Sequence, residues 1–449
     1  MNETQEFEDL KKLVADRQFK LLRPALAELN EVDIAQFLGE LEPAEAVYAF
    51  RALEKDTASD VFAELDPDIQ QEIITSITDQ ELSVIIEDLA VDDAVDMLGE
   101  MPANVVKRVL KNARPDTRSE INQFLKYPDN SAGSIMTAEY TDLHASMSVK
   151  DAIAYIRQNG EDRETIYNCY VMDDARKLLG VTSVKALLLA RDEEKVGDLM
   201  DTPVISITTL EDRETAARLL DKYHFLALPV VDSENRLVGI ITVDDAIDVL
   251  KQETTEDFQV MAATSPSEDP YLKTGVLTLA KNRIVWLLVL MVSDMISGGI
   301  LGHFEAALTA MPLLITFIPM LTDTGGNAGS QSSTLVIRGI ALKEIHLDDF
   351  FAVLWKEIRV AGLCGFVLAM FNFVRLIIVY PGQYMVALTV AAAMFCTVLM
   401  AKAIGGVLPL IATKCRMDPA LMASPLITTI VDAASLLIYL NIAKACLKL

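Results

Sequence analysis

The chain has 449 residues and a formal net charge of −26, yet 51% of its residues are hydrophobic. The charge is unevenly distributed. Residues 1–273 hold 56 acidic and 27 basic residues, a net of −29, whereas residues 274–449 hold 9 and 12, a net of +3. This division excludes a single soluble domain and a disordered acidic chain. A nucleic-acid partner is also excluded, because the acidic part would repel phosphates.

Residues 1–130 predict an α-helical repeat domain. From Leu29 to Ala113 an apolar residue recurs every 12 positions, and further apolar residues stand three and four positions before each. Such a pattern is typical of short helices that restart at every repeat and stack into a superhelix. Pro43, Pro67 and Pro102 stand at repeat starts, where a helix tolerates proline. The sequence opens without the apolar stretch of a signal peptide, so we expect this acidic part in the cytosol.

The outer positions of the predicted superhelix are acidic. Asp92 and Asp96 lie four residues apart on one helical face, a spacing at which like charges repel. A divalent cation would relieve that repulsion, although a solvated acidic face is the alternative. The acidic positions are Asp60, Glu64, Asp66, Asp68, Asp92, Asp93, Asp96 and Glu100.

Residues 131–250 contain two unequal copies of one strand–helix–strand–strand–helix unit, which predicts an α/β domain pair. Their turns align at Gly180 and Gly239. The second copy contains LPVVDSENRLVGIITVDDAIDVL, which resembles the second half of a cystathionine-β-synthase (CBS) domain. CBS pairs are regulatory modules without catalytic activity and often bind adenine nucleotides or metal ions. The resemblance therefore implies that ATP or another adenine nucleotide could bind here.

Residues 251–273 predict a connector helix that continues from the second CBS-like copy. Glu253, Glu256 and Asp257 share one face of this helix. An exposed solvated helix is one interpretation. The other is an ion-sensing lever that joins the acidic body to the apolar part.

Residues 274–449 predict five transmembrane helices, since each of five apolar stretches reaches the roughly 20 residues that a bilayer requires. Lysine and arginine flank the first span, the link between the second and third, and the link between the fourth and fifth. The positive-inside rule then places the N-terminus in the cytosol and the C-terminus outside. The predicted spans are 284–304, 311–337, 360–380, 384–411 and 421–445.

Two polar features inside these spans predict a cation path. Asp432 lies near the middle of the fifth span, where a lone carboxylate is costly, and the only basic residue near that depth is Lys402. The second span contains TDTGGNAGSQSS. We expect Gly325, Gly326 and Gly329 to weaken the helix and expose backbone carbonyls, which with Asn327 and a carboxylate would suit hydrated Mg²⁺.

The order of repeat domain, CBS pair, connector and five spans bearing TGGNAGSQ and DPALMASPLITTIVD resembles the MgtE-type magnesium channel family along almost the whole chain. The resemblance implies a homodimer whose pore lies on the twofold axis, where Asp432 of both subunits binds the permeating hydrated ion. It also implies that cytosolic Mg²⁺ bridges the soluble elements and closes the pore. The candidate pore residues are Asp432, Gly325, Gly326, Asn327, Ser424 and Thr428.

The resemblance assigns the regulatory Mg²⁺ sites to acids spread along the chain. They are Asp60, Asp92, Asp96, Asp212, Glu214, Asp245, Asp248, Glu253, Glu256, Asp257 and Asp418. Four positions depart from the family pattern. His224 stands where a regulatory acid can occur, Ser330 and Ser424 stand where asparagine can line the pore, and Asp294 has no expected counterpart.

The predicted function is therefore a Mg²⁺ channel or transporter, not an enzyme, in the cell membrane. Mg²⁺ is both its cargo and its regulator. Three alternatives remain at this stage. Co²⁺ or another divalent cation could be the main cargo, although no His or Cys surrounds Asp432. The protein could be a nonconducting Mg²⁺ sensor. An intramembrane aspartyl protease would need two facing carboxylates, for which only Asp432 and Asp294 can be suggested.

Overall fold

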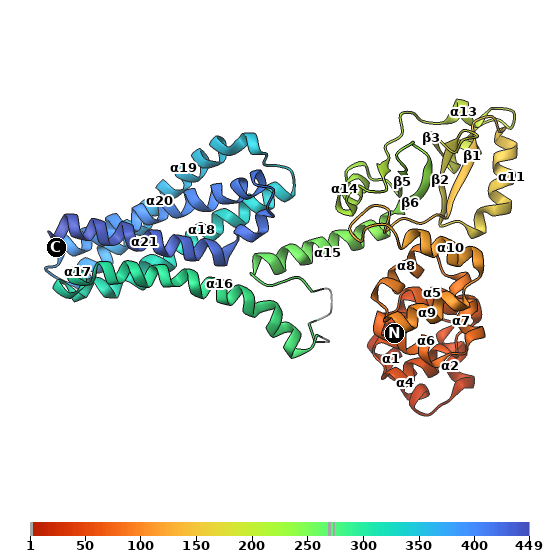
Figure 1. Cartoon of the computed structure of the whole chain (residues 1–449), viewed down its shortest axis with the longest axis horizontal. Coiled ribbons are helices and arrows are strands. Elements are labelled where there is room, and N and C mark those ends of the chain that lie inside the picture. The colour runs from red at the N-terminus through yellow and green to blue at the C-terminus, as the bar shows by residue number, and fades with distance from the viewer. Residues whose placement is uncertain (1–2, 268–270, 273, 449) are drawn as a thin grey trace. The chain divides into compact units, whose positions relative to one another are not determined.

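The computed structural model describes residues 3–267, 271–272 and 274–448, and the side chains of these residues other than 3–6, 56, 162 and 424 (Figure 1). The chain forms two compact units, Met1–Leu250 and Lys251–Leu449. Helices predominate, and the first unit also contains two small sheets. This confirms the predicted fold class, a multidomain and mostly helical chain with a helical superhelix, a CBS-like pair and several long apolar helices.

The superhelix consists of short helices that pack on their second neighbours. Even-numbered helices α4, α6, α8 and α10 form one row, and odd-numbered helices α3, α5, α7 and α9 form the other. The apolar positions of the 12-residue repeat point inward, so that Phe37, Leu38 and Ile73 are fully buried. The helices are α1 (Glu3–Ala15), α2 (Phe19–Leu26), α3 (Glu31–Gly39), α4 (Pro43–Phe50), α5 (Lys55–Ala63), α6 (Pro67–Ser76), α7 (Asp79–Asp88), α8 (Val91–Glu100), α9 (Ala103–Asn112) and α10 (Pro115–Phe124).

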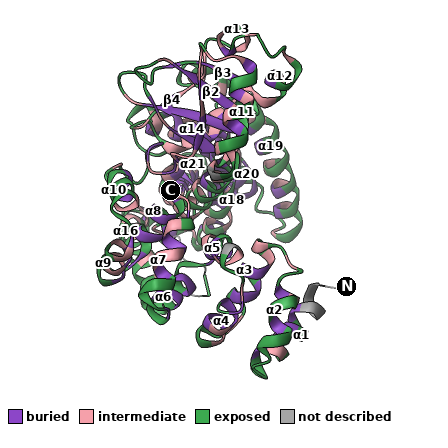
Figure 2. Ribbon diagram, turned by 90° about the vertical axis from the view of Figure 1, so that its right-hand side faces the viewer, coloured by how far each residue is buried: buried purple, intermediate pink, exposed green. Residues whose placement is uncertain are grey.

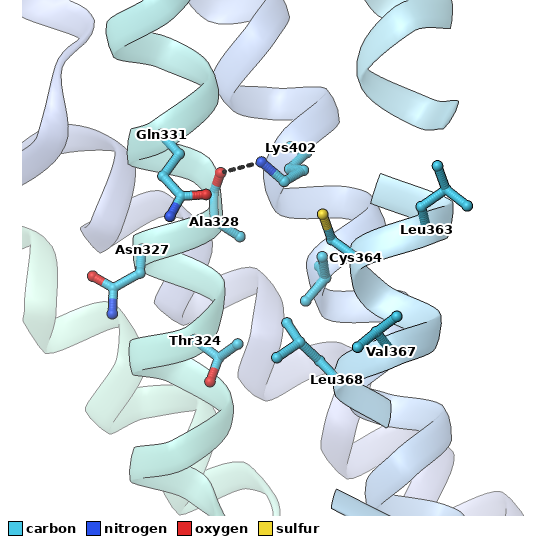
Figure 3. A pocket seen from close by; sticks show the side chains of 10 residues that line it. Thr324, Asn327, Ala328, Gln331, Leu363, Cys364, Val367, Leu368 and Lys402 are labelled. Atoms are coloured by element: carbon cyan, nitrogen blue, oxygen red, sulfur yellow. Dashed lines mark hydrogen bonds between the residues drawn. The ribbon is translucent and has the colours of Figure 1, made fainter. Parts of the chain in front are cut away.

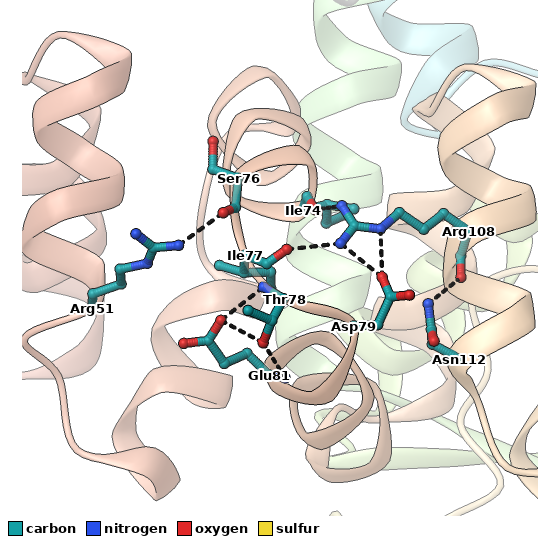
Figure 4. Close-up of polar contacts among 9 residues, drawn as sticks. All are labelled: Arg51, Ile74, Ser76, Ile77, Thr78, Asp79, Glu81, Arg108 and Asn112. Carbon is teal, nitrogen blue, oxygen red and sulfur yellow. Dashed lines mark hydrogen bonds and ion pairs between the residues drawn. The ribbon is translucent and has the colours of Figure 1, made fainter.

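Polar side chains fix the joints between these helices (Figure 4). Arg108 of α9 donates to Oδ1 of Asp79 at 3.1 and 2.9 Å and to the carbonyl of Ile77 at 2.7 Å. Thr78 and Glu81 form a reciprocal capping box at the start of α7. Here, every drawn charge has a counter-charge or a backbone partner close by, so this part of the stack holds together without an added ligand.

The two CBS-like copies have the same sheet topology. In each, a first strand pairs parallel to a second, which pairs antiparallel to a third. Figure 2 shows the strands largely in purple, the colour of buried residues. The first sheet contains β1 (Tyr140–His144), β2 (Thr165–Met172) and β3 (Leu178–Ser183), and the second contains β4 (Ile207–Thr208), β5 (Ala227–Val231) and β6 (Leu237–Thr242).

The two copies exchange their leading segments. Thr137, before the first sheet, bridges to Ile240 of the second, and Asp201, before the second sheet, bridges to Val181 of the first. Gly239 permits the first approach, because an added Cβ would lie 2.7 Å from the Thr137 carbonyl oxygen. The helices of the pair are α11 (Val149–Asn159), η1 (Gly160–Asp162), α12 (Val184–Leu189), α13 (Val196–Leu199), α14 (Arg213–Tyr223) and α15 (Val243–Met261).

The second unit is a bundle of long helices. Within the described residues, four helical segments are long and apolar enough to cross a membrane, namely Val276–His303, Leu347–Val379, Tyr384–Lys414 and Pro419–Leu447. The elements are α16 (Val276–His303), α17 (Glu305–Ala310), η2 (Pro312–Phe317), α18 (Ile318–Ala341), η3 (Leu347–Asp349), α19 (Phe350–Val379), α20 (Tyr384–Lys414), η4 (Pro419–Met422) and α21 (Ser424–Leu447).

Helix α18 replaces the predicted second span, 311–337, and begins only at Ile318. Its 24 residues extend about 36 Å, which is enough to cross a bilayer. Because it contains more polar residues, it is not one of the four apolar segments. It packs against α20 and α21. Its polar sequence therefore lies against other helices of the bundle.

The expectation of an irregular backbone in the second span is wrong, because α18 is helical through Gly325, Gly326 and Gly329. The glycines serve close packing of helices instead. An added Cβ at Gly325 would lie 2.8 Å from Cγ2 of Thr397, and one at Gly326 would lie 2.8 Å from Cγ2 of Thr428. Small residues let membrane helices approach closely, which is the reason that glycine is favoured here.

Candidate ion sites

A carboxylate cluster forms where helix α8 of the superhelix meets the start of α15. Asp92, Asp93 and Asp96 of α8 interact electrostatically with Asp245 of α15, and Glu164, just before β2, interacts with Asp92 and Asp93. The side chain of Asp92 is buried, and its Oδ1 atom has no hydrogen-bond partner. The alternative of a solvated acidic face therefore does not hold at Asp92.

Burial and mutual repulsion raise the pKa of every acid in this cluster. Burial raises the pKa of Asp92 well above its usual value, and the neighbouring Asp93 and Asp245 raise it further. Burial and the charge of Asp245 bring the pKa of Asp93 to about 7 and that of Asp96 to about 6. The pKa of Asp245 is also about 6, mainly because of burial. Arg213 opposes these effects at Asp96, where its positive charge lowers the pKa.

The cluster is a site of concentrated negative charge rather than a finished metal site. Among the described residues, no three acidic, histidine or cysteine side chains converge closely enough to hold a metal ion. A divalent cation would nevertheless lower the repulsion between α8 and α15, because both helices contribute carboxylates. Charge neutralisation would thereby draw the superhelix and the CBS-like pair together.

Three other predicted regulatory acids have local structural contacts. Asp212 caps α14, accepting a hydrogen bond from the Glu214 backbone N–H at 2.8 Å, and Glu214 forms an ion pair with Arg218. Asp418 caps η4 in the same way, accepting from the Ala420 N–H at 2.8 Å. Among the described residues, these contacts hold each acid locally and do not gather the acids around one point.

The remaining predicted regulatory acids are dispersed. Asp60 is exposed on α5, and His224, which has φ of 54°, ends α14. Helix α15 carries Asp248 next to Asp245, and further along it carries Glu253, Glu256 and Asp257. Because α15 runs from the first unit into the second without interruption, it is the continuous connector that the sequence predicts up to Met261. Residues 268–270 and 273 of the predicted connector lie outside the described chain.

A second group of carboxylates surrounds Asp432 in the bundle. Asp432 of α21 is half-buried, and it interacts electrostatically with Asp294 of α16 and Asp323 of α18. Asp294, for which the sequence predicts no family counterpart, therefore lies in the neighbourhood of the predicted pore carboxylate. Three different helices contribute negative charge here, an arrangement that attracts cations.

The other predicted pore residues lie on α18 and α21. Gly325 and Gly326 are buried at helix contacts, with their backbone in regular helix, so their predicted role as carbonyl ligands is not supported. Thr428 donates its hydroxyl to the Pro425 carbonyl at 2.9 Å. The side chain of Ser424 lies outside the described residues.

Asn327 is exposed on α18 and lines a cavity of about 510 Å³ between α18, α19 and α20 (Figure 3). Thr324, Gln331 and Lys402 supply further polar groups, while α19 supplies an apolar wall that includes Leu363. Asp432 does not line this cavity. This cavity therefore does not bring Asn327 and Asp432 together.

Asp93, Glu164 and Asp323 complete these two charge clusters and were not among the predicted ligands. Asp93 is adjacent to Asp92, so its acidity was visible, but helical periodicity predicted a solvent-facing position. Glu164 is distant in sequence from both partner helices, and only tertiary packing brings it close. Asp323 precedes the glycine motif directly and could have been found from its place in TDTGG.

Known families match most of this chain. The family described as a divalent cation transporter, MgtE, matches residues 318–442, the MgtE intracellular N domain matches 29–130, and CBS domains match 132–193 and 196–252. The magnesium transporter MgtE of Thermus thermophilus is 34% identical over 443 residues, which cover 98% of each chain. The magnesium transporter MgtE of Bacillus subtilis is 33% identical over 96% of this chain and 95% of its own length.

A solved structure resembles the soluble part. The crystal structure of the cytosolic domain of the Mg²⁺ channel MgtE in complex with ATP is 34% identical, covers 54% of this chain and 99% of its own length, and superposes with a TM-score of 0.52. A crystal structure of the soluble part of a magnesium transporter gives the same TM-score at 28% identity.

Proposed function

Because this chain belongs to the MgtE family of magnesium transporters, a multi-pass membrane family, we propose that it conducts Mg²⁺ across the cell membrane down the electrochemical gradient. The observation that carries the proposal is the carboxylate group around Asp432. Helices α16, α18 and α21 together contribute Asp294, Asp323 and Asp432. Carboxylates are the hard oxygen ligands that suit a largely hydrated Mg²⁺ ion.

The proposed pore lies between two subunits of a homodimer, where Asp432 of each would face the other. Exposed apolar surface supports a partner or lipid around the bundle, since α16 has no buried residues along its length. The positive-inside rule places the acidic unit and the N-terminus in the cytosol and the C-terminus outside.

The proposed regulation uses the carboxylate cluster between α8 and α15. At low cytosolic Mg²⁺ the acids repel one another and the soluble elements separate. As Mg²⁺ rises, it neutralises these charges and draws the elements together, and α15 carries the change to the pore. A ligand shifts such an equilibrium only through its different affinity for the two states.

The functional division we propose follows the sequence. Residues 1–130 and 131–250 sense Mg²⁺, residues 251–273 transmit the signal, and residues 274–449 form the pore. Since a similar cytosolic domain was crystallised with ATP, we also propose that an adenine nucleotide binds the CBS-like pair here.

The test of the pore is Mg²⁺ uptake by full-length protein in liposomes. Asp432→Ala should reduce uptake by about tenfold or more, because a positioned charge that binds the permeating ion is lost. Glu344→Ala, at an exposed position in the link between α18 and η3, is the control and should retain most of the uptake at low internal Mg²⁺. Unchanged uptake and unchanged selectivity in Asp432→Ala would contradict the pore assignment.

The same liposomes separate the alternatives. A nonconducting sensor would bind Mg²⁺ without uptake, and a Co²⁺ transporter would take up Co²⁺ faster than Mg²⁺. A protease would give no ion uptake, whatever the gradient. The Mg²⁺ proposal predicts uptake that follows the Mg²⁺ gradient.

The test of regulation is closure at high internal Mg²⁺. Neutralising Glu253, Glu256 and Asp257 together, to Gln, Gln and Asn, should leave the channel open, because α15 loses the charges that Mg²⁺ would bridge. Closure at the wild-type Mg²⁺ concentration would show that these acids are not part of the sensor.

A further inference from the structure

Helix α20 buries a lysine inside the membrane-spanning bundle. Lys402 is only 6% exposed, and its ammonium group donates to the carbonyl of Ala328 at 3.5 Å (Figure 3). It also donates to Oγ of Ser332 at 3.3 Å. Both acceptors belong to α18. A buried ammonium in an apolar bundle is costly unless a negative charge compensates it. The sequence suggested Lys402 as the only basic neighbour for Asp432, but the hydrogen bonds of Lys402 go to Ala328 and Ser332.

The compensating charge comes from α19 through a serine. Oγ of Ser332 lies 2.6 Å from Oε2 of Glu357. A hydroxyl group has one proton to donate and lone pairs to accept with. Ser332 can therefore accept from Lys402 and donate to Glu357 at the same time, which matches a charged ammonium and a charged carboxylate. A competing contact from Ser332 to the Ala328 carbonyl is longer, at 3.4 Å, so the carboxylate is the better acceptor.

Adjacent glycines on α20 make room for this arrangement. Gly406 accommodates Glu357, since an added Cβ would lie 2.7 Å from its Cγ atom. Gly405 lies against the carbonyl of Gly329 on α18, and an added Cβ would overlap that oxygen. The carboxylate of α19 and the backbone of α18 thus reach the same short stretch of α20 that carries Lys402.

We propose that Lys402, Ser332 and Glu357 form an internal, serine-bridged ion pair that positions α18 against α19 and α20 for transport. Lys402 is then a positioning residue, because it acts through α18, which carries Asp323 near Asp432. The lysine supplies a tethered cation, so this junction holds at any Mg²⁺ concentration. The effect on transport rests on the proposed function, whereas the effect on stability does not.

A double-mutant cycle on the full-length protein tests the ion pair. Lys402→Met leaves the Glu357 charge uncompensated, and Glu357→Gln leaves the Lys402 charge uncompensated. Each should lower the melting temperature in detergent by about 5 °C or more. The double variant should recover most of this loss, because an apolar and neutral pair of similar size replaces two matched charges. Lys414→Met, at the exposed end of α20, is the matched control and should change little.

Transport by the same variants separates positioning from general destabilisation. In liposomes at low internal Mg²⁺, Lys402→Met should reduce the maximal Mg²⁺ uptake about tenfold, while the external Mg²⁺ that gives half-maximal uptake stays within about twofold. The double variant should regain uptake. If the two single effects simply add in the double variant, or if the singles behave as wild type, the ion pair does not exist as proposed.

Ser332→Ala provides a second variant for the case in which a single charge variant fails to fold. It removes only the bridging hydroxyl, so Lys402 and Glu357 stay in place without their shared partner. Reduced maximal uptake with an unchanged half-maximal Mg²⁺ concentration supports the bridge, and wild-type uptake and stability would overturn it. Wild-type uptake by the charge variants together with an intact melting-temperature coupling would count against the transport role of the junction, not against the ion pair. No uptake by the unaltered protein, with that coupling intact, would contradict the proposed function instead.

Discussion

The soluble and membrane units treat buried charge in opposite ways. Between α8 and α15, burial raises the pKa values of Asp92, Asp93, Asp96 and Asp245, and neighbouring acids raise them further. Arg213 opposes this rise at Asp96. In the bundle, Lys402 contacts a serine that contacts Glu357. The first region has negative charge that it does not neutralise, and the second supplies its own cation.

This difference indicates which region depends on an external ion. Unneutralised carboxylates cost stability, and any divalent cation that reduces their repulsion is bound more tightly in the compact state. A matched internal pair gains nothing from added Mg²⁺. Dependence on Mg²⁺ should therefore be confined to the acid cluster and absent from the junction of α18, α19 and α20.

The largest expected effect is on the bundle. Gly405→Ala places a methyl group against the Gly329 carbonyl, so α18 and α20 must separate. We expect a loss of about 3 kcal/mol or more in stability, or no assembled protein, since overpacking at a backbone contact cannot relax easily. Gly298→Ala, where an added Cβ meets no atom within 4 Å, is the matched control.

Mg²⁺ should not rescue Gly405→Ala if the bundle is independent of the ion. Melting temperatures measured with and without Mg²⁺ decide this. If Mg²⁺ specifically restores the melting temperature of Gly405→Ala, the bundle also depends on the ion, and the proposed difference between the two regions is wrong.

A smaller effect of opposite sign is expected in the acid cluster. Asp92→Asn removes a buried charge whose Oδ1 has no partner, so the Mg²⁺-free protein should become more stable by about 1–2 kcal/mol. The stabilisation that Mg²⁺ adds should shrink at the same time. Asp68→Asn on the exposed surface of α6 serves as the control. If Asp92→Asn destabilises the Mg²⁺-free protein, repulsion at Asp92 does not lower the stability of the folded state.

The last prediction concerns the pH dependence of the Mg²⁺-free protein. The folded-state pKa values of Asp93, Asp96 and Asp245, about 7, 6 and 6, exceed the ordinary value of 3.8, so the folded state binds more protons than the unfolded state. Stability must then fall as pH rises from about 4 to about 7. Thermal unfolding in chelator across this range measures the effect, and added Mg²⁺ should restore most stability at the upper end. A stability that rises over this interval would contradict the raised pKa values.

Periodicity predicted the parts of this fold that depend on local patterns. The 12-residue apolar repeat, the duplicated sheets and the long apolar stretches all arise from residues near one another in sequence. The family resemblance and the importance of Asp432 could also be predicted, because the motif that contains Asp432 is contiguous in the sequence. Function at the level of a magnesium transporter family could therefore be read from the chain.

Contacts between segments that are distant in the sequence could not be predicted in the same way. Gly325 and Gly326 look like helix breakers in isolation, but α20 and α21 fill the space that their missing side chains leave. Asp92 looks solvent-facing until the start of α15 covers it. Lys402 contacts Ser332, which in turn contacts Glu357, 45 positions before Lys402 in the sequence, and no spacing rule connects α19 to α20.

Helix α15 couples the acid cluster to the second unit, and such coupling must act in both directions. It is one uninterrupted helix whose first turn holds Asp245 in the acid cluster and whose later residues belong to the second unit. If Mg²⁺ in the cluster changes the equilibrium of the pore, the pore must change the affinity of the cluster by the same factor. A substitution deep in the bundle that favours the open pore should therefore weaken cytosolic Mg²⁺ binding, without touching a single ligand.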